Sequence, residues 1–377
     1  MAAKQPDEVY HKIKRRVKMK SIKKIVALVM IVAICASCAA CSKGSEDAKE
    51  KYGSTTLKVF IPGEYNSDNF FTDFEKEFGV KVIVEYFDSN EMMYTKFASG
   101  DSYDILVPSD YMIERLIKEE QLQKIDKSLI PNMKNLTEQV KGLAYDADNT
   151  YSVPYFWGTV GIVYNHNNVS LDDLKAKDWD ILKDTRYKGK VYMYDSERDS
   201  FMIAFKQLGY SCNTDNADEI DAAYKWLMEL DEATEPDYVT DEVIDAMIGG
   251  SKDMAIVYSG DAVTILDENE DMSYFTPGCG TNIWCDAMVI PANAANPKLA
   301  HEFINYMLRD EVCTDNTIAV GYASPNAKVL EEMTGEDGEY SENEAYLPRS
   351  YDKDEIFHDN EKLRKKLSEL WIKVKAN

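Results

Sequence analysis

The chain has few of the residues on which most metal and redox sites depend. It contains four histidines, and only four of its seven cysteines lie beyond residue 41. These four are Cys212, Cys279, Cys285 and Cys313. They include no CxxC pair, so the spacing expected of a zinc site is absent. They could form up to two disulfides or remain free buried thiols, and the sequence leaves both open.

Several motifs of catalysis and cofactor binding are also missing. The sequence has no phosphate-binding glycine loop, no nucleophile elbow and no helix-borne histidine pair. We therefore expect neither a metal nor a cofactor.

Basic residues are scarce after residue 40, where 34 Lys and Arg residues stand against 65 Asp and Glu residues. A protein that binds nucleic acid places a surface rich in lysine and arginine on the phosphates, so this imbalance argues against nucleic acid as a partner. Cations are the natural ligands of such a chain. Acidity by itself can also serve only to keep an exported protein in solution.

No apolar run near the N-terminus is long enough to cross a membrane. The run IVALVMIVAI has ten residues, whereas a spanning helix needs about 20. It follows lysines and precedes the small-residue segment CASCAAC, an order typical of a cleaved export signal with a lipid-attachment cysteine. We predict a signal segment over 1–40, starting at Met19, and a flexible lipidated tether over 41–56. The lipid would be attached to Cys41, or alternatively to Cys38, and would hold the exported protein on the outer side of the cell membrane.

Beyond the tether, the pattern of apolar residues predicts an α/β fold. TLKVFIP at 56–62 and VKVIVEYF at 80–87 alternate as half-buried strands do, and a helix rich in phenylalanine and capped by Asp68 separates them. A helix capped by Asn90 and a short strand at 104–107 follow. This strand–helix–strand–helix–strand order calls for a parallel sheet covered by helices.

The same alternation recurs further along the chain. Strands are predicted at 190–194, 254–258 and 283–290, and helices near 200–208, 218–230, 241–248 and 297–308. Between the two sets lies SVPYFWGTVGIVYN at 152–165, a long apolar stretch without a capping signal that suits an extended crossover. Two α/β lobes joined by extended crossovers create a cleft, which is the usual place for a small ligand.

Acidic and aromatic residues recur together at the predicted strand ends, where an α/β sheet places its ligand contacts. They are Glu64-Tyr65, Ser109-Asp110-Tyr111, Asp195 to Asp199, Tyr258, Trp284-Cys285-Asp286 and Tyr322. For any single aromatic residue, a place in the core is the simpler interpretation. The repeated pairing of acids with rings favours a binding site.

Several long segments resemble the spermidine/putrescine-binding proteins of polyamine ABC transporters. The segments are FDSNEMMYTKF at 87–97, SYDILVPSDYMIERL at 102–116, YSVPYFWGTVGIVYN at 151–165, NIWCDAMVIPANAANP at 282–297, and LRDEV with VGYASPNAK at 308–328. The resemblance implies a two-lobed periplasmic-binding-protein fold of type II, with the ligand cleft between lobes joined by two or more crossovers. By that likeness, one lobe comprises 57–163 with 284–318, and the other 164–283 with 319–377.

The resemblance also implies a receptor, not an enzyme, that captures spermidine or putrescine outside the cell and delivers it to ABC permease subunits. We expect a monomer. Carboxylates would pair with the ammonium groups of the polyamine, and rings would cover its methylenes. The matching positions are Tyr65, Ser109, Tyr111, Asp199, Trp284, Asp286 and Tyr322, with Tyr258 where the family often has Trp, and Glu64 and Asp110 as further candidates. Asp286 is the expected central ammonium partner, with Trp284 as a stacking wall beside it.

Two positions depart from the family pattern. Pro62-Gly63 stand where relatives often have Trp followed by a hydroxyl residue, and Ser196 stands where some have an acid. Asp195 and Asp110 are the candidate replacements for that acid. The choice between putrescine and spermidine depends on such positions and stays open.

Two other functions remain as alternatives. An exported hydrolase could use a pair of carboxylates such as Asp199 and Asp286 as acid and base. The same fold could also bind another organic cation or an amino acid. An amino acid would need a cationic partner for its carboxylate, and among these segments only Arg198 offers one.

Overall fold

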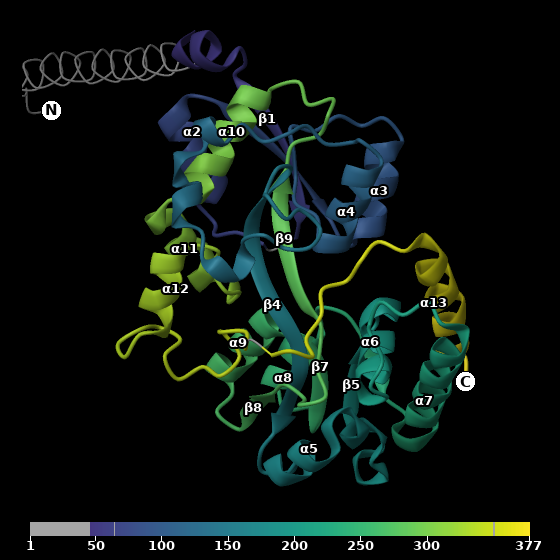
Figure 1. The fold of residues 1–377 in the computed structure, drawn as a ribbon. Coiled ribbons are helices and arrows are strands. Elements are labelled where there is room, and N and C mark those ends of the chain that lie inside the picture. Colours follow the sequence, from purple (N-terminus) through teal and green to yellow (C-terminus); the bar gives the residue numbers. More distant parts are fainter. Residues whose placement is uncertain (1–45, 64, 350) are drawn as a thin grey trace, which may run out of the picture.

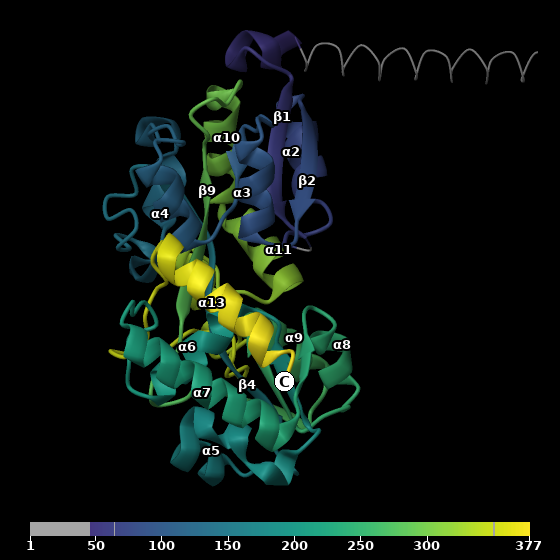
Figure 2. The same ribbon diagram turned by 90° about the vertical axis from the view of Figure 1, so that its right-hand side faces the viewer.

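The computed structural model describes residues 46–63, 65–349 and 351–377, which form a mixed sheet covered by helices (Figures 1 and 2). The predicted signal segment 1–40, the two candidate lipidation sites Cys38 and Cys41, and Glu64 lie outside the described residues. Within the described part, no helix has both the length and the apolar character needed to span a membrane.

The elements follow one another in alternating order. The strands are β1 (Thr56–Pro62), β2 (Lys81–Phe87), β3 (Ile105–Leu106), β4 (Ser152–Asn165), β5 (Val191–Tyr194), β6 (Asp237–Val239), β7 (Met254–Tyr258), β8 (Met272–Phe275) and β9 (Ile283–Val289). The α-helices are α2 (Phe70–Phe78), α3 (Asn90–Ala98), α4 (Asp110–Lys118), α5 (Leu171–Lys177), α6 (Glu197–Gln207), α7 (Ala217–Thr234), α8 (Val243–Ile248), α9 (Ser259–Glu268), α10 (Pro297–Met307), α11 (Asp310–Val320), α12 (Ala327–Thr334) and α13 (Glu361–Val374). Short 3-10 helices lie at Lys127–Leu129, Pro131–Asn135, Glu138–Val140, Asp178–Lys183 and Thr185–Tyr187.

The first three strands form the parallel unit that the sequence predicts. β1 pairs in parallel with β2 on one side and with β3 on the other, and α2 and α3 make the connections. The predicted helix caps are wrong by one residue, because Asn69 and not Asp68 precedes α2, and Ser89 and not Asn90 caps α3. The Asn90 amide instead donates to the Ser109 hydroxyl at 2.9 Å. That bond ties the start of α3 to the start of α4.

β4 joins the two ends of the sheet and confirms the extended crossover predicted at 152–165. Its first half pairs antiparallel with β9, and its second half pairs antiparallel with β7 and β8. The strand order is β2-β1-β3-β9-β4-β7-β5-β6, with β8 also paired to β4. All but the last residue of β4 are buried, which explains its continuous apolar sequence.

Figure 1 shows β4 and β9 passing between two parts of the molecule. The upper part contains β1, β2, β3, α2, α3, α4 and α10, and the lower part contains β5 to β8 and α5 to α9. The residue boundaries given above for the two lobes stay a prediction.

The stretch before β1 is more ordered than the predicted flexible tether. Residues 46–52 are helical, and both Ala48 and Tyr52 are buried. The Tyr52 hydroxyl donates to Glu302 of α10 at 3.1 Å, and the Tyr52 ring packs edge-on against Phe78. The prediction of a flexible tether over all of 41–56 is therefore wrong for this part, because burial of the tyrosine ring offsets the entropy lost on ordering.

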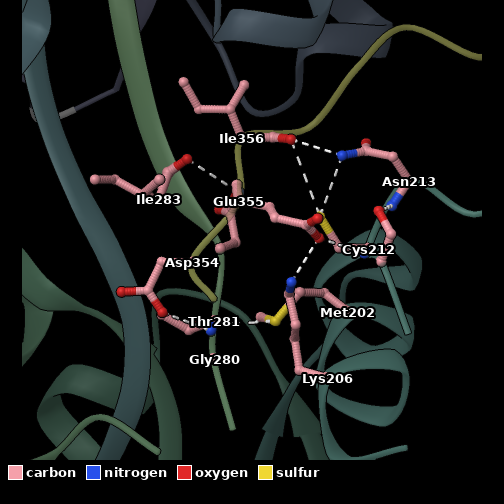
Figure 3. Close-up of polar contacts among 12 residues, drawn as sticks. Met202, Lys206, Cys212, Asn213, Gly280, Thr281, Ile283, Asp354, Glu355 and Ile356 are labelled. Carbon is pink, nitrogen blue, oxygen red and sulfur yellow. Dashed lines mark hydrogen bonds and ion pairs between the residues drawn. The ribbon is translucent and has the colours of Figure 1, made fainter. Parts of the chain in front are cut away.

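The segment Asp354–Asp359, which we call the strap, also contacts both parts. The Glu355 backbone N–H donates to the Thr281 carbonyl, and the Glu355 carbonyl accepts from the Ile283 N–H, both at 3.0 Å (Figure 3). The Glu355 carboxylate accepts from Lys206 Nζ at 2.5 Å, which anchors the strap to α6 in the lower part. At its other end the strap reaches α4 in the upper part, where the Asp359 N–H donates to Glu114 at 2.7 Å.

Glu355→Gln is expected to destabilise the fold by roughly 3 kcal/mol, because it leaves the Lys206 ammonium buried without a charged partner. The Lys206 side chain is 6% exposed and that of Glu355 is 34% exposed. Urea unfolding would measure the difference. Glu361→Gln is the matched control, since Glu361 and Lys365 form an exposed pair whose loss is expected to change stability much less. Equal effects of the two substitutions would contradict the prediction.

The four cysteines of the described chain are free thiols. The sequence left open whether these cysteines form disulfides or remain free thiols, and the structure has free thiols. Burial raises the pKa of Cys279 and of Cys313 to about 12, and it raises the pKa of Cys212 and Cys285 as well. Thiols in this state carry almost no thiolate and react slowly.

Candidate functional site

A cavity of ≈ 700 Å³ lies between the upper and lower parts. Nine of the ten candidate ligand contacts line it, and the tenth, Glu64, lies outside the described residues. The nine are Tyr65, Ser109, Asp110, Tyr111, Asp199, Tyr258, Trp284, Asp286 and Tyr322. The structure thus brings together residues that are up to 257 positions apart in the sequence.

The topology explains this convergence. The parallel strands β1 and β3 end at the cavity from above, and β5 and β7 end at it from below, so the residues that follow each strand face the same space. An isolated bridge between Ser109 and Asp286 joins the start of α4 to β9. Trp284 and Asp286 point to the same side of β9, because side chains alternate along a strand.

Asp286 has the most distinctive environment in the cavity. Its Oδ2 atom accepts from the Tyr65 hydroxyl at 2.7 Å, whereas its Oδ1 atom is buried and has no hydrogen-bond partner among the described residues. The residue is 8% exposed, and burial raises the pKa of its carboxyl to about 6, against the opposing effect of the Tyr65 and Ser109 hydroxyls. A buried carboxylate oxygen in this state requires a donor, and a cation is the best one.

Three further carboxylates each accept from the hydroxyl of a tyrosine that lines the cavity, and two of them, Asp199 and Asp241, line it themselves. The pairs are Tyr258–Asp199 at 2.8 Å, Tyr322–Asp261 at 3.0 Å and Tyr194–Asp241 at 3.0 Å. Burial raises the pKa of Asp199, and it raises the pKa of Asp261 to about 7. Tyr258 and Tyr194 orient Asp199 and Asp241 and each occupies one acceptor oxygen, so the other oxygen stays available to a ligand. Asp261 does not line the cavity and instead holds the hydroxyl of Tyr322.

Sequence reasoning missed Tyr194, Asp241 and Asp261. Tyr194 ends β5 and Asp261 lies in the first turn of α9, so both follow the rule of acids and rings at strand ends. A prediction of α9 would have pointed to Asp261, and treating the last residue of β5 as a candidate contact would have pointed to Tyr194. Asp241 follows β6, a three-residue strand that gives no periodic signal.

The rings form one continuous wall. Trp284 packs edge-on against Tyr322 at 5.0 Å and against Tyr258 at 6.1 Å between ring centroids. Tyr65 packs against Tyr322 at 5.7 Å. Such edge-to-face contacts hold the rings in place without a ligand. The indole N–H of Trp284 is buried and has no acceptor in the described part of the chain, so it offers a further donor at the wall.

Gly260 allows this wall to form, because a Cβ atom there would lie 2.2 Å from the Tyr322 ring. We expect Gly260→Ala to displace Tyr322 and to lower the free energy of unfolding by about 1–3 kcal/mol. Thermal unfolding together with near-ultraviolet circular dichroism would show the change. Gly249→Ala is the control, since a Cβ atom there meets nothing closer than 3.4 Å. An unchanged aromatic spectrum of Gly260→Ala would contradict this role.

The two candidate replacements for the acid missing at Ser196 lie in different surroundings. Asp110 is buried at the start of α4, where it accepts from the Tyr111 N–H at 2.6 Å, and burial raises its pKa to about 8. Asp195 accepts from the Trp371 indole N–H at 2.9 Å and from Lys375, so α13 already neutralises it. Ser196 itself accepts from the Asp199 N–H at the start of α6, which explains a hydroxyl residue there.

The chain is similar to a group of transport proteins. Residues 69–348 match the family of bacterial extracellular solute-binding proteins. The chain is 34% identical over 275 residues to the spermidine/putrescine-binding periplasmic protein of Escherichia coli, a match that covers 72% of this chain and 78% of that protein. It is 30% identical over 346 residues to a putrescine-binding periplasmic protein of Pseudomonas aeruginosa, covering 85% of this chain and 92% of that protein.

A solved structure gives the same result for the fold. The substrate-binding protein of a spermidine/putrescine ABC transporter from Streptococcus pneumoniae aligns with a TM-score of 0.74 at 33% identity. The alignment covers 86% of this chain and 99% of that one.

Proposed function

This chain belongs to the family of bacterial extracellular solute-binding proteins, and we propose that it binds a linear polyamine, spermidine or putrescine, as the receptor of an ABC importer. The family membership also confirms the two-lobed α/β periplasmic-binding-protein fold that the sequence predicts. One observation of the structure carries the proposal. The cavity wall combines oriented carboxylates with rings packed edge to face, and Asp286 Oδ1 is buried there without a donor among the described residues.

A polyamine matches this wall in both of its chemical parts. Its ammonium groups can donate to Asp286 and Asp199, and such charge-assisted bonds replace the water that is lost on burial. Its methylenes gain about 0.8 kcal/mol each from apolar burial, and a ring face near an ammonium adds roughly 0.5–2 kcal/mol. Tyr258, Trp284 and Tyr322 supply the rings.

We further propose the setting in which binding takes place. The signal segment directs the chain out of the cytoplasm, and a lipid on Cys41, or on Cys38, holds it at the membrane as a monomer. The lobes 57–163 with 284–318 and 164–283 with 319–377 close on the ligand, since the bound polyamine contacts both only when they are together. The closed form then delivers the polyamine to the permease subunits, without any reaction at the site.

A thermal-shift panel of putrescine, cadaverine, spermidine, spermine and several amino acids tests this function. A ligand present at 100 times its Kd stabilises the fold by about 2.7 kcal/mol, so the preferred polyamine is expected to raise Tm by roughly 5 °C. An increase with an amino acid but with no amine would overturn the proposal. Turnover of a glycoside that Asp286→Asn abolishes would instead support the carboxylate-pair hydrolase.

A further inference from the structure

Arg198 places a permanent positive charge in a cavity whose other charged lining residues, apart from Arg364, are acidic. It lies in the first turn of α6, in the lower part, and its guanidinium covers the ring of Tyr111 of α4, in the upper part, at 3.9 Å from the ring centroid. The same guanidinium lies 5.0 Å from the ring centroid of Phe357 in the strap and donates to the His358 carbonyl at 3.4 Å. One side chain therefore contacts the upper part, the lower part and the strap.

The surroundings of Arg198 do not suggest an ordinary ion pair. No carboxylate of the described chain lies within ion-pair distance of its guanidinium, although its charge lowers the pKa of Asp110 and Asp199 against the larger effect of burial. If this charge acted only through electrostatics, its removal would strengthen the binding of a cation. The position of the guanidinium over two rings indicates a different role.

The strap that carries Phe357 is held on both sides of this contact. Before Phe357, the Glu355 carboxylate accepts from Lys206 and from the Cys212 N–H, as Figure 3 shows. After it, the Asp359 N–H donates to Glu114 of α4. In Figure 2 the chain then enters α13, which crosses in front of the lower part. A ring fixed between two anchors is a rigid surface for a guanidinium.

We propose that Arg198 is a positioning residue whose stacking on Tyr111 and Phe357 latches the lower part to the upper part and to the strap before the ligand arrives. The inference rests on the proposed function, because the latch contributes to polyamine affinity by holding the two walls of the cavity together. It does so although Arg198 has the same sign of charge as the ligand. A contact of this kind changes an equilibrium about 3- to 30-fold.

The test compares Arg198→Gln, which removes the charge, with Arg198→Lys, which keeps the charge but not the planar guanidinium. Both variants are expected to bind putrescine and spermidine about 3- to 30-fold more weakly in calorimetry, with faster dissociation. Small-angle scattering of the ligand-free chains is expected to show a larger radius of gyration than in the parent chain. Arg186→Gln is the control, because Arg186 lies on the surface and does not line the cavity.

The inference is overturned if Arg198→Gln binds either polyamine as tightly as the parent chain or more tightly. It is also overturned if ligand-free Arg198→Gln and the parent chain scatter identically. Circular dichroism establishes that each variant is folded. Failure of the proposed function gives a different result, since the parent chain would then bind no polyamine, while the ligand-free scattering would still decide whether the latch exists.

Discussion

Asp286→Asn is expected to weaken spermidine binding by roughly 2–5 kcal/mol, which corresponds to about 30- to 5,000-fold in Kd. The substitution keeps the size of the side chain and leaves an oxygen that can accept from the Tyr65 hydroxyl. It removes the negative charge beside the ligand ammonium. Because Asp286 is buried, little water is available to replace that charge, so the loss is expected to be larger than at an exposed site.

Calorimetry at pH 8 with spermidine and putrescine would measure this effect. Asp253→Asn is the matched control, since Asp253 is an equally buried aspartate that pairs with Lys190 and Asn168 and does not line the cavity. It is expected to change stability and to leave Kd unaltered. Unchanged affinity in Asp286→Asn would remove Asp286 from the binding site, and equal losses in both variants would indicate a general effect on folding.

Elements with a strong local pattern were predictable from the sequence. β1, β2, β4 and β7 are found within one residue of the predicted ranges, because their apolar residues either alternate or form an unbroken buried run. Nine of the candidate contacts lie at one cavity because acids and rings follow the strand ends, which the fold gathers in one place. Resemblance to a family added the role of each position.

Features that depend on distant partners were not predictable in this way. The hydroxyl of Tyr65 reaches Asp286 across 221 positions, and Asp195 is neutralised by Lys375 only because α13 packs against α6 and α7. No local pattern contains such pairings. The helical turn at 46–52 was missed for the same reason, since its order depends on the contact of Tyr52 with α10.

Lowering the pH from 8 to 5 is expected to weaken polyamine binding at least about tenfold. In the ligand-free protein, burial raises the pKa of two carboxyls that line the cavity, of Asp286 to about 6 and of Asp110 to about 8. A bound ammonium favours the charged carboxylate and lowers these values again, so binding releases protons below pH 8. At pH 5, one unit below the pKa of Asp286, displacing its proton alone costs about a factor of ten.

The stability of the ligand-free fold changes with pH in the opposite direction to ligand affinity. Because these carboxyls have a higher pKa in the folded chain than the ordinary 3.8, their contribution to stability is present below about pH 4 and is lost as pH rises through 6 to 8. The increase in Tm caused by the ligand is therefore expected to grow with pH over the window in which the ligand-free chain loses this contribution.

Titration calorimetry in buffers of different ionisation enthalpy would count the protons released at each pH. Asp286→Asn is expected to abolish the step near pH 6 and to leave the step assigned to Asp110, because an asparagine cannot titrate there. A Kd for spermidine that is equal at pH 8 and pH 5 would mean that these carboxylates do not meet the ammonium groups. Proton release that persists unchanged in Asp286→Asn would assign the lowest step to another acid of the cavity, and Asp199, whose pKa burial also raises, is the one to substitute next.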